Sequence, residues 1–254
     1  MKAITVFANP KKFEALSQCI APIAFWTFLV LSAIGLFFAL FQSPADYQQG
    51  DSVRIMYVHV PAAWLSQFAF VFIAMMSLVA YVWRHPVADI VARSAAMPGA
   101  VFTALTIFTG AVWGKPTWGA PWVWDPRLTS VLILLFIYIG YIAVWRSIAD
   151  TERAARFARL VALVGVINVP IIKFSVDWWN SLHQPASIIR ADGPAMHASM
   201  LTPLVLMWLA YTAFFVWSVL TGARSLLLFN QVERRSRHAP RTAKITAFNA
   251  EASS

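Results

Sequence analysis

Two histidines with similar neighbours are the residues best suited to chemistry in this chain. His59 lies in the segment 56–64, Met-Tyr-Val-His-Val-Pro-Ala-Ala-Trp, and His183 lies in 177–187, Asp-Trp-Trp-Asn-Ser-Leu-His-Gln-Pro-Ala-Ser. Each has a proline two residues later and a tryptophan within five residues. A neutral imidazole offers a nitrogen lone pair to a metal. A single histidine near a helix end is usually a cap, but two in matching contexts favour a shared role as ligands.

A tryptophan-rich stretch lies between the two histidines. It holds four of the chain's 12 tryptophans, and it reads Trp113-Gly-Lys-Pro-Thr-Trp118-Gly-Ala-Pro-Trp122-Val-Trp124-Asp125-Pro-Arg127-Leu-Thr129. Tryptophan combines a flat apolar face with one N–H donor, which suits either a belt at the membrane interface or a flat ligand. Both interpretations stand for each tryptophan taken alone. Four tryptophans among several glycines and prolines favour a folded loop that acts as a platform. Asp125 is expected to hold this loop in shape, either by accepting a hydrogen bond from a tryptophan N–H or by pairing with Arg127.

These residues suit haem better than zinc. Zinc sites usually take three or four protein ligands, whereas haem iron needs only axial ligands from the protein. His59 and His183 would complete six-coordinate iron. The 113–129 tryptophans, together with Trp178 and Trp179, would form flat apolar walls. Candidate cationic partners for the haem propionates are Arg54, Lys115, Arg127 and Arg190.

The composition is that of an integral membrane protein. Hydrophobic residues make up 59% of the 254 residues and charged residues only 12%, against about 25% charged in soluble domains. The net charge of +9 does not indicate a nucleic-acid partner, because the basic residues lie in loops and tails between apolar runs. The single cysteine, Cys19, excludes an internal disulfide and a thiolate metal cluster.

Stretches without Asp, Glu, Lys or Arg predict an all-α polytopic fold with six transmembrane helices. They are 15–45, 55–83, 94–114, 128–145, 160–172 and 193–223. About 20 helical residues cross a hydrocarbon core of roughly 30 Å. The fifth stretch is short, and 157–176 would span if Arg159 and Lys173 reached opposite interfaces. Pro170 should kink that helix or end it early.

The basic residues predict the orientation. With six spans, most of the 20 Lys and Arg residues fall on the side that holds both termini, which places the termini in the cytoplasm and the 113–129 loop, His59 and His183 outside. We expect a membrane domain over 1–229 and a disordered basic cytoplasmic tail over 230–254 that touches anionic membrane lipid. His85, His197 and His238 are expected to be structural. No phosphate-binding glycine loop is present in the sequence, so ATPase machinery is not expected in this chain.

The chain resembles a known family at these motifs. The 113–129 segment is similar to the tryptophan-rich "WWD" signature of haem-handling membrane proteins, and the contexts of His59 and His183 are similar to that family's two outward histidines. With its length and six expected spans, roughly residues 20–225 resemble the haem exporter protein C (CcmC) family of bacterial cytochrome c maturation system I.

The resemblance implies a specific function at the periplasmic face of the bacterial inner membrane. There the protein would bind haem b with His59 and His183 as axial ligands. The 113–129 loop would contact haem and present it to a periplasmic haem chaperone (CcmE), which takes it covalently through its own histidine. Implied partners are an ABC-type ATPase and its membrane subunit (CcmA and CcmB) and a small single-span subunit (CcmD). ATP hydrolysis would then belong to a partner, and this chain would be a haem-handling subunit and not an enzyme.

Three alternatives remain open from the residues. A b-type membrane cytochrome for electron transfer also pairs histidines, although normally in mid-helix. A haem permease would need polar groups at mid-membrane depth, for which Asn168 is the clearest candidate. A relative that ligates haem to apocytochrome would usually be longer, with more spans.

Overall fold

The computed structural model describes residues 9–179, 181–183, 188 and 192–238, and the described part is built of helices. The elements are α2 (Pro10–Phe37), the π-helical turn η1 (Phe38–Gln42), the 3₁₀ helix η2 (Asp51–Ile55), α3 (Met56–Trp83), α4 (Ala88–Trp118), α5 (Pro126–Ser147), α6 (Thr151–Gly165), α7 (Asn168–Trp178) and α8 (Ala198–His238). Six helical segments within this part are long and apolar enough to cross a membrane. The predicted all-α, six-span membrane fold is confirmed.

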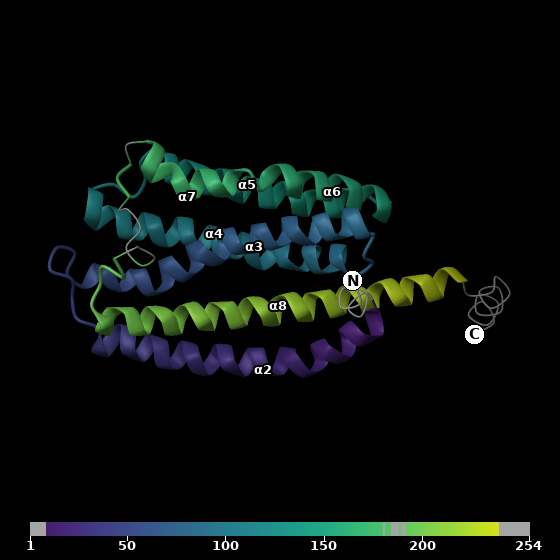
Figure 1. Ribbon diagram of the computed structural model, residues 1–254, viewed down its shortest axis with the longest axis horizontal. Helices are drawn as coiled ribbons and strands as arrows, with labels where there is room; N and C mark the ends of the chain where they lie inside the picture. Colours follow the sequence, from purple (N-terminus) through teal and green to yellow (C-terminus); the bar gives the residue numbers. More distant parts are fainter. Residues whose placement is uncertain (1–8, 180, 184–187, 189–191, 239–254) are drawn as a thin grey trace, which may run out of the picture.

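The helices lie roughly parallel in an elongated bundle (Figure 1). α2 packs along α8 at one edge, α3 and α4 form the central pair, and α5 with α6 and α7 forms the opposite edge. The start of α2 and the end of α8 lie toward one end of the bundle. The turn after η1, the α4–α5 connection and the end of α7 lie at the other end. The segments that carry the candidate site are therefore gathered at the end opposite to the start of α2.

Small residues let the central helices approach closely. The buried faces of α3 and α4 contribute alanines at 62, 69, 92, 95 and 96 to the core, and close packing through small side chains is a main source of helix association in membranes. Tyr138 of α5 reaches into this region and donates its hydroxyl to the Ser66 carbonyl at 2.7 Å. A Cβ at Gly99 would lie 2.6 Å from Cε1 of Tyr138, so glycine is required for this contact.

The fifth span is made of two helices. α6 and α7 together cover Thr151–Trp178, with the break at residues 166–167. Pro170 is the third residue of α7; its ring and missing N–H are incompatible with an unbroken helix through Val166. The expected interruption is confirmed, and it lies just before the proline. Arg159 pairs with Asp89 in the first turn of α4, where its Nε donates to Oδ1 at 2.9 Å.

Asn168 is the first residue after this break, and its side-chain amide is hydrogen-bonded in the core. It is buried, and its Nδ2 donates to the Ser130 carbonyl at 2.8 Å. At the chain's other end, α8 continues past residue 229, the expected end of the membrane domain, to His238. Residues 230–238 are thus helical rather than irregular, and 239–254 lie outside the described residues.

Candidate functional site

His59 faces α4 from the beginning of α3. Its Nδ1 lies 3.0 Å from Oγ1 of Thr109, and its ring meets Trp113 edge-on at a centroid distance of 5.6 Å. A Cβ at Gly110 would lie 3.2 Å from Cε1 of His59, so the glycine allows the imidazole to approach the helix. Thr109, Gly110 and Trp113 are three and four residues apart, which places them on one face of α4.

His183 follows the end of α7 and lies against the same helix. Its ring centroid is 5.0 Å from that of Trp118. Nδ1 of His183 is buried and has no hydrogen-bond partner among the described residues. Burial lowers the pKa of His183 to about 4, with the charge of Arg127 acting in the same direction and the Asp125 carboxylate opposing both. This imidazole is therefore neutral at physiological pH and retains a lone pair.

The structure brings the two histidines into one neighbourhood. Both rings pack against the C-terminal part of α4. Each has one indole of α4 beside it, Trp113 next to His59 and Trp118 next to His183. Residues separated by more than 120 positions thus converge through α3, α4 and the segment after α7.

The tryptophan-rich stretch is less of a loop than its glycines and prolines predicted. α4 continues through Trp118 and α5 begins at Pro126, so only residues 119–125 are non-helical. Gly119 ends α4 with φ of 78°, a left-handed conformation that glycine adopts without strain, and its N–H donates to the Lys115 carbonyl at 3.0 Å. Two of the four tryptophans are therefore held on a rigid helix.

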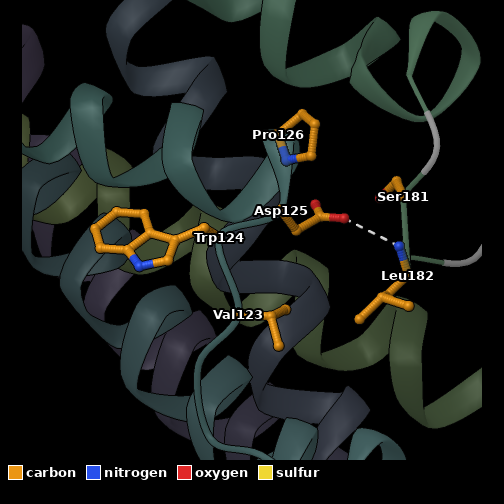
Figure 2. A pocket seen from close by; sticks show the side chains of 6 residues that line it. All are labelled: Val123, Trp124, Asp125, Pro126, Ser181 and Leu182. Carbon is orange, nitrogen blue, oxygen red and sulfur yellow. Dashed lines mark hydrogen bonds between the residues drawn. The ribbon is translucent and has the colours of Figure 1, made fainter.

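Asp125 joins this loop to the segment that carries His183. One carboxylate oxygen accepts the Arg127 backbone N–H at 2.8 Å and so caps α5, and the other accepts the Leu182 N–H at 3.0 Å (Figure 2). Burial by itself would raise the pKa of Asp125, but hydrogen bonds from Ser181 and from the two backbone N–H groups bring it below its usual value. Backbone groups thus take the place of the tryptophan N–H or Arg127 guanidinium that the sequence suggested.

The remaining tryptophans form an outer set. Trp122 and Trp124 meet edge-to-face at 5.7 Å, and Trp124 is 77% exposed, its indole pointing away from the Asp125–Leu182 contact (Figure 2). Trp178 stacks on Phe174 at 5.5 Å and meets Trp179, and both indoles are exposed. The predicted walls therefore divide into an inner pair on α4 and an outer set, of which Trp124, Trp178 and Trp179 are exposed.

The basic residues that could pair with haem propionates differ in the protein groups that they already contact. Arg127 has a buried Nε without a partner among the described residues, while its Nη2 donates to the Lys173 carbonyl at 3.3 Å. Arg54 is engaged: Nε pairs with Asp51 at 3.0 Å, and Nη1 donates to two carbonyls at the C-terminal end of the first span. Lys115 is exposed, and Arg190 lies outside the described residues. Arg127 is therefore the cation best placed to bind an anionic group near His183.

Comparison with known proteins decides the family. The family model described as "Heme exporter protein C" matches residues 3–238. The chain belongs to the haem exporter protein C family. The "Heme exporter protein C" of Bradyrhizobium diazoefficiens is 50% identical over 225 residues, covering 89% of this chain and 85% of the relative. That of Haemophilus influenzae is 40% identical over 228 residues, covering 90% and 93%. A "Putative cytochrome c biosynthesis ccmC-like mitochondrial protein" of Marchantia polymorpha is 42% identical over 208 residues, covering 81% and 87%.

Membership in the haem exporter protein C family agrees with the resemblance drawn from the tryptophans, Asp125 and the two histidines. The structure adds residues that those motifs did not include. Thr109 and Gly110 contact His59, and Gln49 accepts the Trp113 N–H at 2.8 Å. The Thr109–Trp113 spacing of four was the sequence signal for a shared helical face. Gln49 had no such signal, because its contact depends on how the turn after η1 folds back.

Proposed function

We propose that this protein binds haem b at the periplasmic surface of the bacterial inner membrane and delivers it to the haem chaperone CcmE during cytochrome c maturation. The observation that carries the proposal is that His59 and His183 both pack against the C-terminal part of α4, each with an indole beside it. The names of its relatives refer to haem export and cytochrome c biosynthesis, which agrees with a haem cargo.

The donor set fits a haem. A porphyrin supplies four nitrogen ligands and leaves two axial positions for protein side chains. Within the described part of the chain, His183 has a buried ring nitrogen without a partner, and Arg127 has a buried guanidinium N–H in the same state. Buried polar atoms normally have hydrogen-bond partners, so these two atoms indicate groups that a ligand completes. We assign His59 and His183 to the iron and Arg127 to a propionate.

The tryptophans have two tasks in this proposal. Trp113 and Trp118 stand on α4 beside the histidines, where flat faces would pack against the porphyrin. The outer set consists of the exposed Trp124, Trp178 and Trp179 and the half-buried Trp122, and it offers an apolar surface at the outer end of the bundle. Exposed indoles of this kind suit contact with the haem edge or with the accepting chaperone.

The delivery step needs partners. We propose an ABC-type complex with CcmA, CcmB and the single-span CcmD, in which CcmA hydrolyses ATP and this chain acts as a haem-handling subunit, not as an enzyme. The sequence contains no phosphate-binding glycine loop, which supports placing ATP hydrolysis elsewhere. Both termini are assigned to the cytoplasm and the tryptophan surface to the periplasm.

The rival functions have less support. His59 lies one turn into α3 and His183 follows α7, so both are at one end of the bundle and not in mid-membrane, where a b-type electron carrier would hold them. Asn168, the polar residue that suggested a permease path, is hydrogen-bonded to the Ser130 carbonyl in the core. Haem binding at the outer edge is therefore the function that the geometry favours.

The test is the absorption spectrum of the purified full-length protein with haem. His59→Ala and His183→Ala are each expected to alter the six-coordinate low-spin spectrum and to abolish transfer to CcmE. His197→Ala is the matched control, because this exposed histidine contacts Ser199 at the start of α8 and is expected to leave both unchanged. A double variant of His59 and His183 that kept the wild-type spectrum would refute the ligand assignment.

A further inference from the structure

Thr109 is the polar residue in closest contact with His59. Its Oγ1 lies 3.0 Å from Nδ1, and the threonine is buried in α4. Nothing in the tryptophan or histidine motifs includes this residue. Its position behind the imidazole, on a helix that also supplies Trp113, raises the question of which group donates in the contact.

The threonine's own hydrogen bond settles the direction. A hydroxyl has one proton, and that of Thr109 is directed to the Leu105 carbonyl at 2.7 Å, the usual bond of a helical threonine to the residue four positions earlier. A carbonyl can only accept, so the proton is committed there. Oγ1 of Thr109 must then accept from His59, which requires the proton of the neutral imidazole to be on Nδ1.

We propose that Thr109 is a positioning residue that holds His59 as the Nδ1–H tautomer, which leaves the Nε2 lone pair available to bind the iron of a haem. The proposal rests on the proposed function, in which His59 is an axial ligand. Metal-ligating histidines commonly donate their other ring N–H to an acceptor, which fixes the orientation of the ring and makes the ligand more basic. Gly110 contributes by letting the imidazole reach the threonine.

The two histidines differ in their hydrogen-bond partners. Nδ1 of His59 has a protein partner, whereas Nδ1 of His183 has none among the described residues. Loss of the Thr109 hydroxyl should therefore affect one axial ligand and leave the other as it is. That difference is measurable, because ligand basicity influences both the reduction potential of haem iron and its electron paramagnetic resonance.

The experiment compares three variants of the full-length protein loaded with haem. Thr109→Val keeps the branched shape and removes the acceptor, and Thr109→Ser keeps the hydroxyl. Thr103→Val is the matched control, because Thr103 is also buried in α4 and makes the same bond, to the Gly99 carbonyl at 2.8 Å. The readouts are the haem dissociation constant, the midpoint potential and the ferric resonance spectrum.

We expect Thr109→Val to weaken haem binding about tenfold, within the range for loss of such a partner, to raise the midpoint potential and to change the ferric spectrum. Thr109→Ser should restore all three, and Thr103→Val should match the wild type. Equal behaviour of Thr109→Val and Thr103→Val, or weaker binding with unchanged potential and spectrum, would overturn the positioning role. If His59→Ala also left the spectrum unchanged, the proposed function would fail with it; a changed His59→Ala spectrum confines the failure to Thr109.

Discussion

Arginines that look equivalent in the sequence differ once their partners are known. Arg54 and Arg127 each lie near an outer helix end and each could bind a propionate. In the structure the Arg54 guanidinium holds Asp51 and two carbonyls, and the Arg127 Nε has no partner among the described residues. Sequence reasoning could nominate both but could not choose, because a guanidinium's partners come from segments brought together only by folding.

This contrast predicts different effects for the two substitutions. Arg127→Gln should weaken haem binding about tenfold or more, because a charge-assisted hydrogen bond in a partly buried site contributes about 1.5–3 kcal/mol. Arg54→Gln should instead lower the thermal midpoint of the protein in detergent, because it releases the end of the first span. Haem titration and thermal unfolding of both variants provide the check. Equal loss of haem affinity in the two would contradict the assignment.

At the scale of helices, the apolar runs were enough to predict six spans, and Pro170 was enough to predict a broken fifth span. The end of α4 was not predictable in the same way. Gly114 and Pro116 argue against helix, yet the helix continues to Trp118, because Gly114 packs directly under the Trp118 ring and Gly119 provides the left-handed end. The low helix propensity of Gly114 and Pro116 was therefore overridden by the Gly114–Trp118 contact and by the left-handed conformation of Gly119.

Gly119 should therefore be sensitive to substitution. Gly119→Ala requires an alanine to adopt the left-handed backbone conformation, which lowers the free energy of unfolding by roughly 1–2 kcal/mol. The cost is conformational, because the space around an added Cβ is open. Gly140→Ala is the control: it lies within α5, also in open space, and should be neutral or slightly stabilising because alanine is the better helix former. Thermal unfolding in detergent measures both. A Gly119→Ala midpoint no lower than that of Gly140→Ala would show that the α4 end does not depend on this conformation.

At the scale of the whole molecule, the bundle has a clear polarity. The turn after η1, the α4–α5 connection and the end of α7 share one end, and the start of α2 and the end of α8 share the other. With six spans that alternate in direction, the beginning of the first span and the end of the last must lie at the same end of the bundle. The positive-inside rule predicts the direction, with the basic end in the cytoplasm. Convergence of His59 and His183 could be expected from this topology, but their neighbours Thr109 and Gln49 could not, because contacts between helices depend on rotation about each axis.

Topology is testable with cysteines at the two ends. Cys19 is replaced by serine, and single cysteines are introduced at Lys115 near the outer end of α4 or at Arg153 in α6, both exposed in the structure. A membrane-impermeant maleimide added to intact spheroplasts should label position 115 and reach position 153 only after lysis. The reverse pattern would place the tryptophan surface in the cytoplasm and exclude delivery to a periplasmic chaperone.

The two bonds of the Asp125 carboxylate have a mechanical consequence. One bond holds the start of α5, and the other holds the backbone next to His183. The exposed indole of Trp124 is covalently adjacent to this carboxylate. A protein that docks on this indole and shifts residues 119–125 would strain the hydrogen bond between Asp125 and the Leu182 N–H, next to His183. Docking at the surface would then be coupled to release of the histidine ligand.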